Sequence, residues 1–282
     1  MTASNPPRDE APLDTTAHLM SAIGTELAGR LRLVRPDGRR RPAPPALVLV
    51  AHGSRDPRAL STVRTLLERV RELRPALPVH LGHIELNAPL LSDTLTALGD
   101  TEAVLVPLLL TRGYHVKRDI PELAAASPVR ARVAAPLGPH PLLVETLYAR
   151  LTEAGWPVRA TQSERRASAV VLAAAGSRDP DSTADTRRTA RLLADRLGVP
   201  VVAAYASAAT PTVETALRAL TARGRHRIAV ASCFTAPGRF ATQCAASAPW
   251  MAAQPLGAHP AMARLVLRRY DQALRIPATT AA

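Results

Sequence analysis

The sequence contains an internal repeat, and this feature constrains the fold more than any other. ALVLVAHGSRDP at 46–57 returns as AVVLAAAGSRDP at 169–180, and PLGPHP at 136–141 returns as PLGAHP at 255–260. The two matches occur in the same order at shifts of 123 and 119 residues, which indicates a duplicated domain rather than chance. Each copy is therefore expected to fold into a similar unit.

The two copies differ in two of their histidines. Ala175 occupies the position of His52 in the second copy, and Phe240 occupies the position of His115 when SCFTAPGRF is aligned with PLLLTRGYH. The second copy keeps GSRDP without the histidine, so the turn itself does not require His52. This asymmetry predicts that the chemistry resides in the first copy.

The other histidines favour structural roles. His140 and His259 recur in both copies within PLGxHP, which predicts a structural corner. His80 and His83 belong to a predicted strand, where packing or solvent exposure is the simpler interpretation.

Apolar runs of strand length alternate with helical periodicity in both copies, which favours an α/β fold with parallel sheets covered on both faces. We expect two tandem domains, each a four-stranded parallel sheet flanked by helices and each with its own core, related by a pseudo-twofold duplication. The strands predicted in the first copy are 46–51, 79–86, 103–110 and 129–134.

The pattern also predicts domain boundaries. Residues 1–44 are rich in proline and arginine and are interpreted as a flexible N-terminal extension with one helix near Thr16–Leu33. The segments that follow are a first domain carrying the active site (45–154), a linker (155–167) and a degenerate second domain (168–276).

The net charge of +13 is almost entirely arginine, since Lys117 is the single lysine. Compositional bias of GC-rich coding sequence and a polyanionic small substrate both remain open as explanations. Nucleic-acid binding is disfavoured because the arginines are spread and few aromatic residues lie among them. No apolar stretch reaches the length of a membrane span, and the first residues do not resemble a secretory signal, so a cytoplasmic protein is expected.

Three polar residues of the first copy follow predicted strands at their carboxyl ends, namely His52, Glu85 and His115. In parallel sheets such ends meet at one edge, where ligands bind. Two imidazoles and a carboxylate can bind a divalent metal or accept protons. The alternatives are a turn cap for His52, an exposed loop position for His115 and an ordinary strand-end acid for Glu85.

Basic residues are predicted in the loops at the same edge, and together they would form a rim that attracts anions. Each could also be an ordinary solvated surface charge. These residues are Arg55, Arg58, Arg112, Lys117 and Arg118.

The motifs VLVAHGSRDP, IELNAPLL and VPLLLTRGYHVKRDIPE resemble those of the sirohydrochlorin chelatases of the CbiX type, in the long form that has two fused domains. The resemblance is strong over 46–151 and weaker in the second copy. It implies that His52 and His115 bind the metal, that His52 accepts protons, and that Glu85 assists proton removal or metal delivery. Many relatives have an acidic residue where this chain has Ala88, which leaves Glu85 as the remaining carboxylate candidate.

The resemblance also implies that the loop between strand and histidine borders the tetrapyrrole. The substrate-binding residues implied are Ser54, Arg55, Leu110, Thr111, Arg112, Gly113, Tyr114 and Lys117. In the second copy, Arg178 and Arg239 are expected near the corresponding edge.

The implied activity is that of an ATP-independent lyase that inserts Fe²⁺ or Co²⁺ into sirohydrochlorin for siroheme or cobalamin biosynthesis. No Walker-type GxxxxGK[ST] is present, in agreement with a reaction that uses no nucleotide. A monomer with an internal pseudo-dimer is expected, without nucleic-acid or membrane partners. The alternatives are a non-catalytic metal or tetrapyrrole carrier, a hydrolase or mutase with a nucleophilic histidine, and a nucleic-acid-binding α/β protein.

Overall fold

The computed structural model describes Met20 and residues 44–275. The chain divides into two units, 1–44 and 45–282, and both copies of the repeat lie in the second. The helix predicted at Thr16–Leu33 lies, apart from Met20, outside the described residues.

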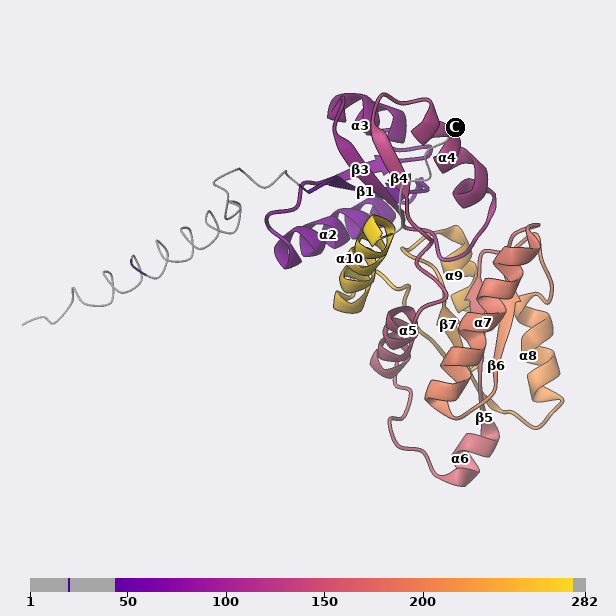
Figure 1. The fold of residues 1–282 in the computed structure, drawn as a ribbon. Helices are drawn as coiled ribbons and strands as arrows, with labels where there is room; N and C mark the ends of the chain where they lie inside the picture. Colours follow the sequence, from indigo (N-terminus) through magenta and orange to yellow (C-terminus); the bar gives the residue numbers. More distant parts are fainter. Residues whose placement is uncertain (1–19, 21–43, 276–282) are drawn as a thin grey trace, which may run out of the picture. The chain divides into compact units, whose positions relative to one another are not determined.

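Each copy forms one four-stranded parallel sheet, as the sequence predicts (Figure 1). The strand order is β2-β1-β3-β4 in the first sheet and β6-β5-β7-β8 in the second, so the duplicated topology is the same. The central strands are runs of fully buried residues, which is why their sequences are continuously apolar. The strands are β1 (Ala46–Ala51), β2 (Val79–His83), β3 (Glu102–Pro107), β4 (Arg130–Val133), β5 (Ser168–Ala174), β6 (Val201–Tyr205), β7 (Arg227–Ser232) and β8 (Met251–Ala252).

Helices cover both faces of the two sheets (Figure 1). In the first copy they are α2 (Pro57–Leu73), α3 (Leu91–Leu98), one π-helical turn (His115–Asp119) that continues into α4 (Ile120–Ala125), and α5 (Pro141–Glu153). In the second copy they are α6 (Gln162–Ala167), α7 (Pro180–Leu197), α8 (Val213–Thr221), α9 (Arg239–Ala246) and α10 (Pro260–Arg275).

The repeated GSRDP segment makes the same turn in both copies. The Asp56 carboxylate accepts a hydrogen bond from the backbone N–H of Arg58 at 2.9 Å and caps α2. Asp179 caps α7 in the same way through the N–H of Asp181, also at 2.9 Å. In each case proline occupies the first turn of the helix, where its missing N–H costs nothing.

The repeated PLGxHP segment is a structural corner, as predicted. The imidazole of His140 accepts a hydrogen bond from the N–H of Leu142 at 3.1 Å and caps α5. His259 accepts from the N–H of Ala261 at 3.2 Å, at the start of α10. Both histidines are therefore explained by helix capping.

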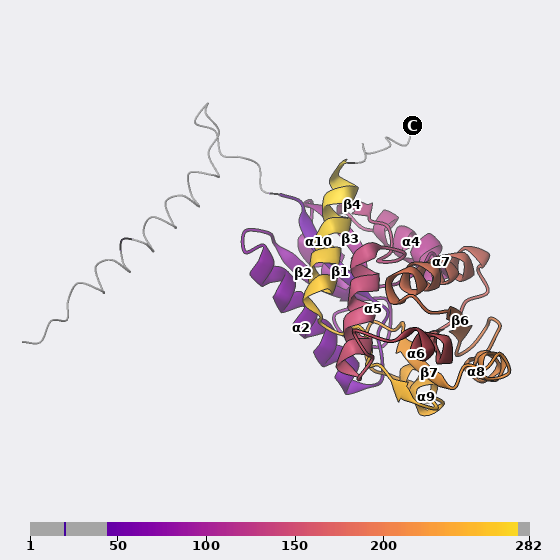
Figure 2. The ribbon, with the colours of Figure 1, turned by 90° about the horizontal axis from the view of Figure 1, so that it is seen from below.

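The last helix of each copy packs against the sheet of the other copy. Helix α5 contacts α7 and β7 of the second copy, whereas α10 contacts α2 and β3 of the first (Figure 2). The hydroxyl of Tyr270, on α10, donates to the carbonyl of Pro45 at 2.6 Å, just before β1. This reciprocal exchange joins the two copies.

The exchange merges the cores on the inner faces of the two sheets. One hydrophobic cluster contains Leu47 and Val104 of the first sheet together with Val170 and Ala229 of the second. Separate clusters remain on the outer faces, under α3 and α4 in the first copy and under α8 in the second. The expectation that each copy has its own core therefore fails on the inner faces, where the core is shared, while each copy keeps a cluster of its own on the outer face.

Three predicted elements differ in extent. The strand expected at 103–110 is Glu102–Pro107, so Leu110 lies in the loop after it. The strand expected at 79–86 ends at His83, so Glu85 lies in the bend that follows β2. The predicted linker 155–167 contains α6, which begins at a capping box formed by Thr161 and Glu164.

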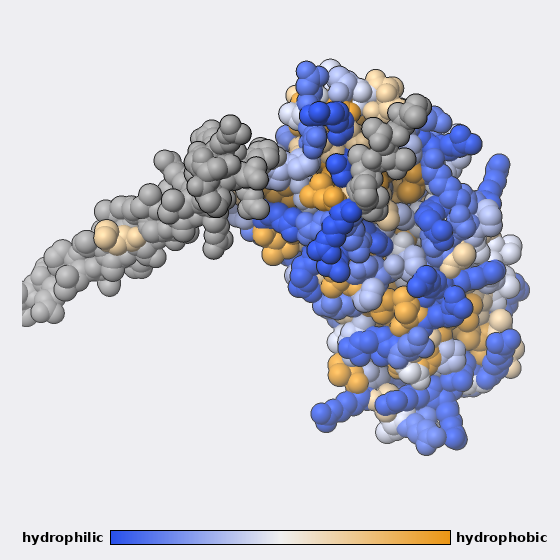
Figure 3. Space-filling view, in the orientation of Figure 1, coloured by the Kyte–Doolittle hydropathy of each residue, from blue (hydrophilic) through white to orange (hydrophobic). Residues whose placement is uncertain are grey.

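No helix in the described part of the chain is long and apolar enough to cross a membrane. Hydrophilic side chains are spread over the face seen in Figure 3, and apolar ones form only small separate areas there.

Candidate functional site

A glycine brings the turns after β1 and β2 into contact. Gly53 has a φ of 107°, and a Cβ added there would lie 1.9 Å from the carbonyl oxygen of Glu85. The N–H of Glu85 in turn donates to the carbonyl of His52 at 3.0 Å. Only glycine permits this approach, and it fixes His52 next to Glu85.

The His52 and Glu85 side chains face each other at the carboxyl edge of the sheet. The distance between His52 Nδ1 and Glu85 Oε1 is 3.4 Å, and both side chains are about half exposed to solvent. The same pair of turns is joined by Asn87, whose side-chain oxygen accepts from the N–H of Ser54 at 2.7 Å. Sequence reasoning did not single out Asn87.

His115 is the first residue of the π-helical turn, and Asp119 lies one turn later. The Nδ1–H of His115 donates a short hydrogen bond to Asp119 Oδ2. A carboxylate on one ring nitrogen orients the imidazole and leaves the lone pair of Nε2 for another partner. The spacing of four residues in HVKRD was the signal for Asp119, which the sequence analysis did not use.

The two histidines meet, as predicted. The rings of His52 and His115 lie edge to face with centroids 4.6 Å apart. Neither Nε2 atom has a hydrogen-bond partner within residues 44–275. The arrangement therefore offers two imidazole rings close together, each with a carboxylate at its Nδ1.

The two histidines suit a metal that is bound transiently and then transferred to another molecule. In the described segments, no group of three or more His, Cys, Asp or Glu residues has the geometry of a metal site. Two imidazoles leave most coordination positions of a first-row divalent metal free for other ligands. A metal bound here would remain accessible to a second molecule.

A cavity of about 1190 Å³ lies between the copies, beside His52. Its walls come from the turn after β1, the bend after β2, and the segment 234–243 of the second copy. Leu86 contributes an exposed apolar side chain, and its φ of 67° shows that the bend requires the left-handed region. The cationic side chains on the walls are Arg55, Arg58 and Arg239.

Two of the predicted substrate-binding residues, Ser54 and Arg55, border this cavity. The predicted loop 110–115 does not border it in the described part of the chain. It lies against the second copy instead, with Gly113 near Ser177 and the Thr111 hydroxyl 2.8 Å from that of Ser182. The cavity wall is formed by the second-copy counterpart of that loop, which the sequence analysis did not predict.

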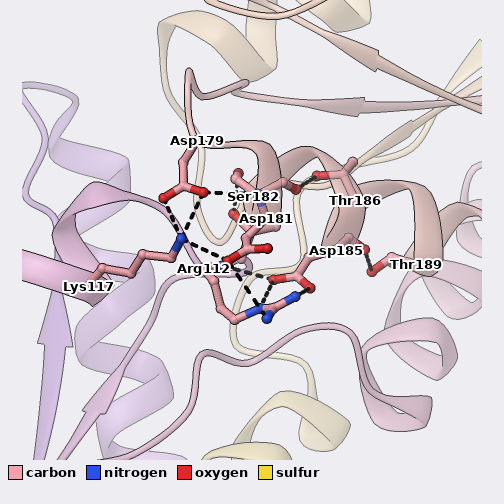
Figure 4. Close-up of polar contacts among 9 residues, drawn as sticks. Arg112, Lys117, Asp179, Asp181, Ser182, Asp185, Thr186 and Thr189 are labelled. Carbon is pink, nitrogen blue, oxygen red and sulfur yellow. Dashed lines mark hydrogen bonds and ion pairs between the residues drawn. The ribbon is translucent and has the colours of Figure 1, made fainter.

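Arg112 and Lys117 form ion pairs with α7 and the residue that caps it (Figure 4). Arg112 binds Asp185 through Nε at 3.0 Å and a terminal nitrogen at 2.7 Å. Lys117 Nζ lies 2.9 Å from Asp179 and 2.8 Å from Asp181. The expected anion-attracting rim is neutralised at these two positions because acidic residues of the second copy already balance both charges.

These contacts shift the ionisation of the groups involved. Hydrogen bonds from Lys117 lower the pKa of Asp179 and Asp181 below the ordinary range, and the pKa of Lys117 is raised in return. The Asp185 carboxylate raises the pKa of Arg112. Lys117, Arg112, Asp179 and Asp181 are therefore charged at neutral pH.

His80 and His83, on β2, are the other two histidines of the first copy's sheet. Burial lowers the pKa of His80 and His83, so both are neutral at neutral pH. His83 is almost fully buried and its Nδ1 lies 3.1 Å from the carbonyl oxygen of Pro89. The prediction of packing roles is confirmed for His83.

Comparison with known proteins agrees with the duplicated fold. The family model CbiX matches residues 46–154 and again 169–273. The chain is 32% identical over 166 residues to the sirohydrochlorin ferrochelatase of Bacillus subtilis, covering 56% of this chain and 60% of that enzyme. It is 37% identical over 81 residues to the sirohydrochlorin cobaltochelatase of Methanococcus aeolicus, covering 28% of this chain and 57% of that enzyme. The chain thus matches less than two thirds of the length of these relatives.

Solved structures share the fold. SirB from Bacillus subtilis with Fe³⁺ matches with a TM-score of 0.64 at 24% identity, over 81% of this chain and 94% of SirB. SirB of subspecies spizizenii in complex with cobalt matches with the same TM-score at 23% identity, over 82% and 96% of the two chains. Since the family model matches both copies and most of the chain, the protein belongs to the CbiX family.

Proposed function

We propose that the protein is a sirohydrochlorin chelatase, a lyase that inserts Fe²⁺ or Co²⁺ into sirohydrochlorin without a nucleotide. The observation that carries the proposal is the contact between the imidazoles of His115 and His52, of which His52 borders the open cavity between the copies. The relatives named as sirohydrochlorin ferrochelatase and cobaltochelatase support the same reaction. The product would serve siroheme or cobalamin biosynthesis.

The histidines bind the metal substrate through their Nε2 atoms. Asp119 orients His115 through Nδ1, and Glu85 lies on the Nδ1 side of His52. Imidazole accepts both iron and cobalt, so these ligands do not select between the two metals. The open coordination positions allow the nitrogens of the macrocycle to replace the protein ligands.

Insertion releases two N–H protons from the macrocycle, and they need an acceptor. Once the metal leaves His52, the Nε2 lone pair becomes available for a proton. Glu85, 3.4 Å from Nδ1, then stabilises the imidazolium that forms. Half exposure of both side chains lets the proton pass on to solvent.

The cavity has room for a large, flat polycarboxylate. Arg55 and Arg239 approach it from opposite walls, and neither has an acidic partner among residues 44–275. Arg58 is different because it pairs with Asp56 at 2.7 Å. We assign carboxylate binding to Arg55 and Arg239, with Leu86 and Phe240 supplying apolar contact to the ring.

The test is anaerobic metal insertion followed by absorbance, with Co²⁺ and Fe²⁺ and with the variants His52→Ala and His115→Ala. Wild-type turnover that collapses in both variants would support the proposal. His226→Ala is the matched control, because His226 is an exposed histidine of the second copy. A folded wild type that does not exceed the spontaneous rate would refute the enzyme, and stoichiometric tight binding would then indicate a carrier.

A further inference from the structure

The loop that carries His115 is attached to the second copy on both sides of the histidine. Upstream, the N–H of Arg112 donates to Asp185 at 3.0 Å and its guanidinium forms a fork on the same carboxylate. Downstream, Lys117 joins Asp179 and Asp181. Within the loop, the Gly113 carbonyl accepts from the N–H groups of Val116 and Lys117, each at 3.1 Å.

The contact between Arg112 and Asp185 restricts the position of the loop. The Asp185 side chain is only 4% exposed, and three hydrogen bonds from one residue satisfy it. One of these comes from the main chain, so Asp185 fixes the backbone of Arg112 as well as its side chain. Bidentate carboxylate–guanidinium contacts restrict geometry more than a point charge does.

We infer that the second copy positions His115 for metal binding, with Asp185 as the main positioning residue and Asp179 and Asp181 as its supports. His115 lies three residues after Arg112 and two before Lys117, so both anchors restrain the π-helical turn on which it sits. Metal ligands held to a fraction of an ångström keep a favourable bound geometry, whereas a displaced loop loses it.

This inference explains why the second copy retains GSRDP although it lacks the histidine. Asp179 caps α7 through one oxygen and also binds Lys117. Ser177 accepts from the N–H of Asp179 at 3.1 Å, and a Cβ at Gly113 would lie 3.7 Å from the Ser177 hydroxyl oxygen. The motif thus has a role at the interface that does not need an imidazole.

The effect expected on the rate of metal insertion rests on the proposed function, whereas the effect expected on Co²⁺ affinity does not. The first measurement is the affinity of the full-length protein for Co²⁺ alone, by calorimetry, in wild type, His115→Ala and Asp185→Asn. Asp185→Asn retains the shape and removes the charge. We expect it to lose about tenfold in Co²⁺ affinity, in the direction of His115→Ala.

The kinetic measurement separates positioning from folding. Asp185→Asn is expected to lower kcat for Co²⁺ insertion about tenfold while KM for sirohydrochlorin changes less than about twofold. Lys117→Met, at a side chain that is 39% exposed, should give a smaller loss of the same kind without risk to the fold. Lys117→Arg, which retains the charge, should restore the wild-type values.

The matched control is Arg74→Met. Arg74 binds Asp271 through two contacts of 2.7 and 2.9 Å and also joins the two copies, but it lies just beyond the far end of α2 from His52. It should lower thermal stability and leave Co²⁺ affinity and kcat unchanged. Wild-type kcat and Co²⁺ affinity in Asp185→Asn would overturn the inference, whereas absence of turnover in the wild type would count against the proposed function alone.

Discussion

The two junctions between the copies have the same origin and opposite character. At one junction the first-copy loop 110–117 meets the start of α7, and five charged residues join them. At the other, the second-copy segment 234–243 faces the start of α2 across the cavity. Duplication supplies two equivalent junctions, of which one is closed and the other is open.

A few substitutions account for the difference. When the copies are aligned, Pro237 and Thr242 stand where the first copy has Arg112 and Lys117. On the partner surface, Arg58 and Thr62 stand where the second copy has Asp181 and Asp185. The open junction therefore lacks counterparts of the two cations, Arg112 and Lys117, and of the carboxylates of Asp181 and Asp185, although Asp56 stands where the second copy has Asp179. Without these ion pairs the two surfaces stay apart and leave the cavity beside His52.

The sharpest comparison is between equivalent positions of the two copies. His115→Ala is expected to lower the insertion rate by about 10²-fold or more, because removal of a metal ligand should cost at least as much as removal of the group that orients one. Phe240→Ala, at the equivalent position of the second copy, should change KM by only a few-fold through lost apolar contact. Steady-state kinetics with Co²⁺ and sirohydrochlorin measure both. Equal losses of kcat in the two variants would mean that the copies share the chemistry.

The carboxylate behind His115 should have the next largest effect. Asp119→Asn keeps the size of the side chain but weakens the hydrogen bond that orients the imidazole, and we expect about a tenfold loss of Co²⁺ affinity. Calorimetric titration with Co²⁺ checks it. Unchanged affinity in a folded variant would show that the helix alone orients the ring.

The two sheets and the histidine pair are the features that could be predicted from the sequence. Buried strands such as β1 and β5 are continuous apolar runs, so the two parallel sheets are predictable from residues alone. The loss of imidazole at Ala175 and Phe240 located the histidine pair, because it compares two copies of one fold. Both inferences use local pattern or internal repetition.

The helix exchange and the cavity wall could not be found in this way. The apolar faces of α5 and α10 show that each helix is buried, but not against which sheet. Likewise the loops 110–115 and 235–240 occupy equivalent positions, and charged residues in the loop and on the surface opposite it distinguish the closed junction from the open one. Both features depend on contacts between the two copies, which join residues far apart in the sequence, such as Arg112 with Asp185 and Tyr270 with Pro45.

Substrate binding at the open junction should depend on Arg239, which has no acidic partner among residues 44–275. Arg239→Gln is expected to raise KM for sirohydrochlorin about fivefold with little change in kcat, since an exposed charge contact contributes modestly to binding. Arg178→Gln is the matched control, because Arg178 is also an exposed arginine of the second copy but is not part of the cavity wall. A lower kcat at unchanged KM in Arg239→Gln would contradict a role in binding alone.

The ion pairs of Lys117 at the closed junction should have the smallest effect, a change in thermal stability that depends on pH. Lys117 lowers the pKa of Asp179 and Asp181 below the ordinary value of 3.8, so these ion pairs stabilise the fold above that pH and are lost as the carboxylates protonate in acid. Lys117→Met should therefore lower Tm by about 1–2 °C at pH 7, because exposed ion pairs contribute little.

Thermal unfolding of wild type and Lys117→Met, measured from pH 7 down to about pH 2, tests this directly. Asp179 also caps α7, but that hydrogen bond is present in both proteins and cancels in the difference of their Tm values. The difference should shrink as the pH falls through the lowered pKa values and vanish in stronger acid. A difference that persists unchanged under acid conditions would mean that Lys117 contributes by packing of its alkyl chain rather than by charge.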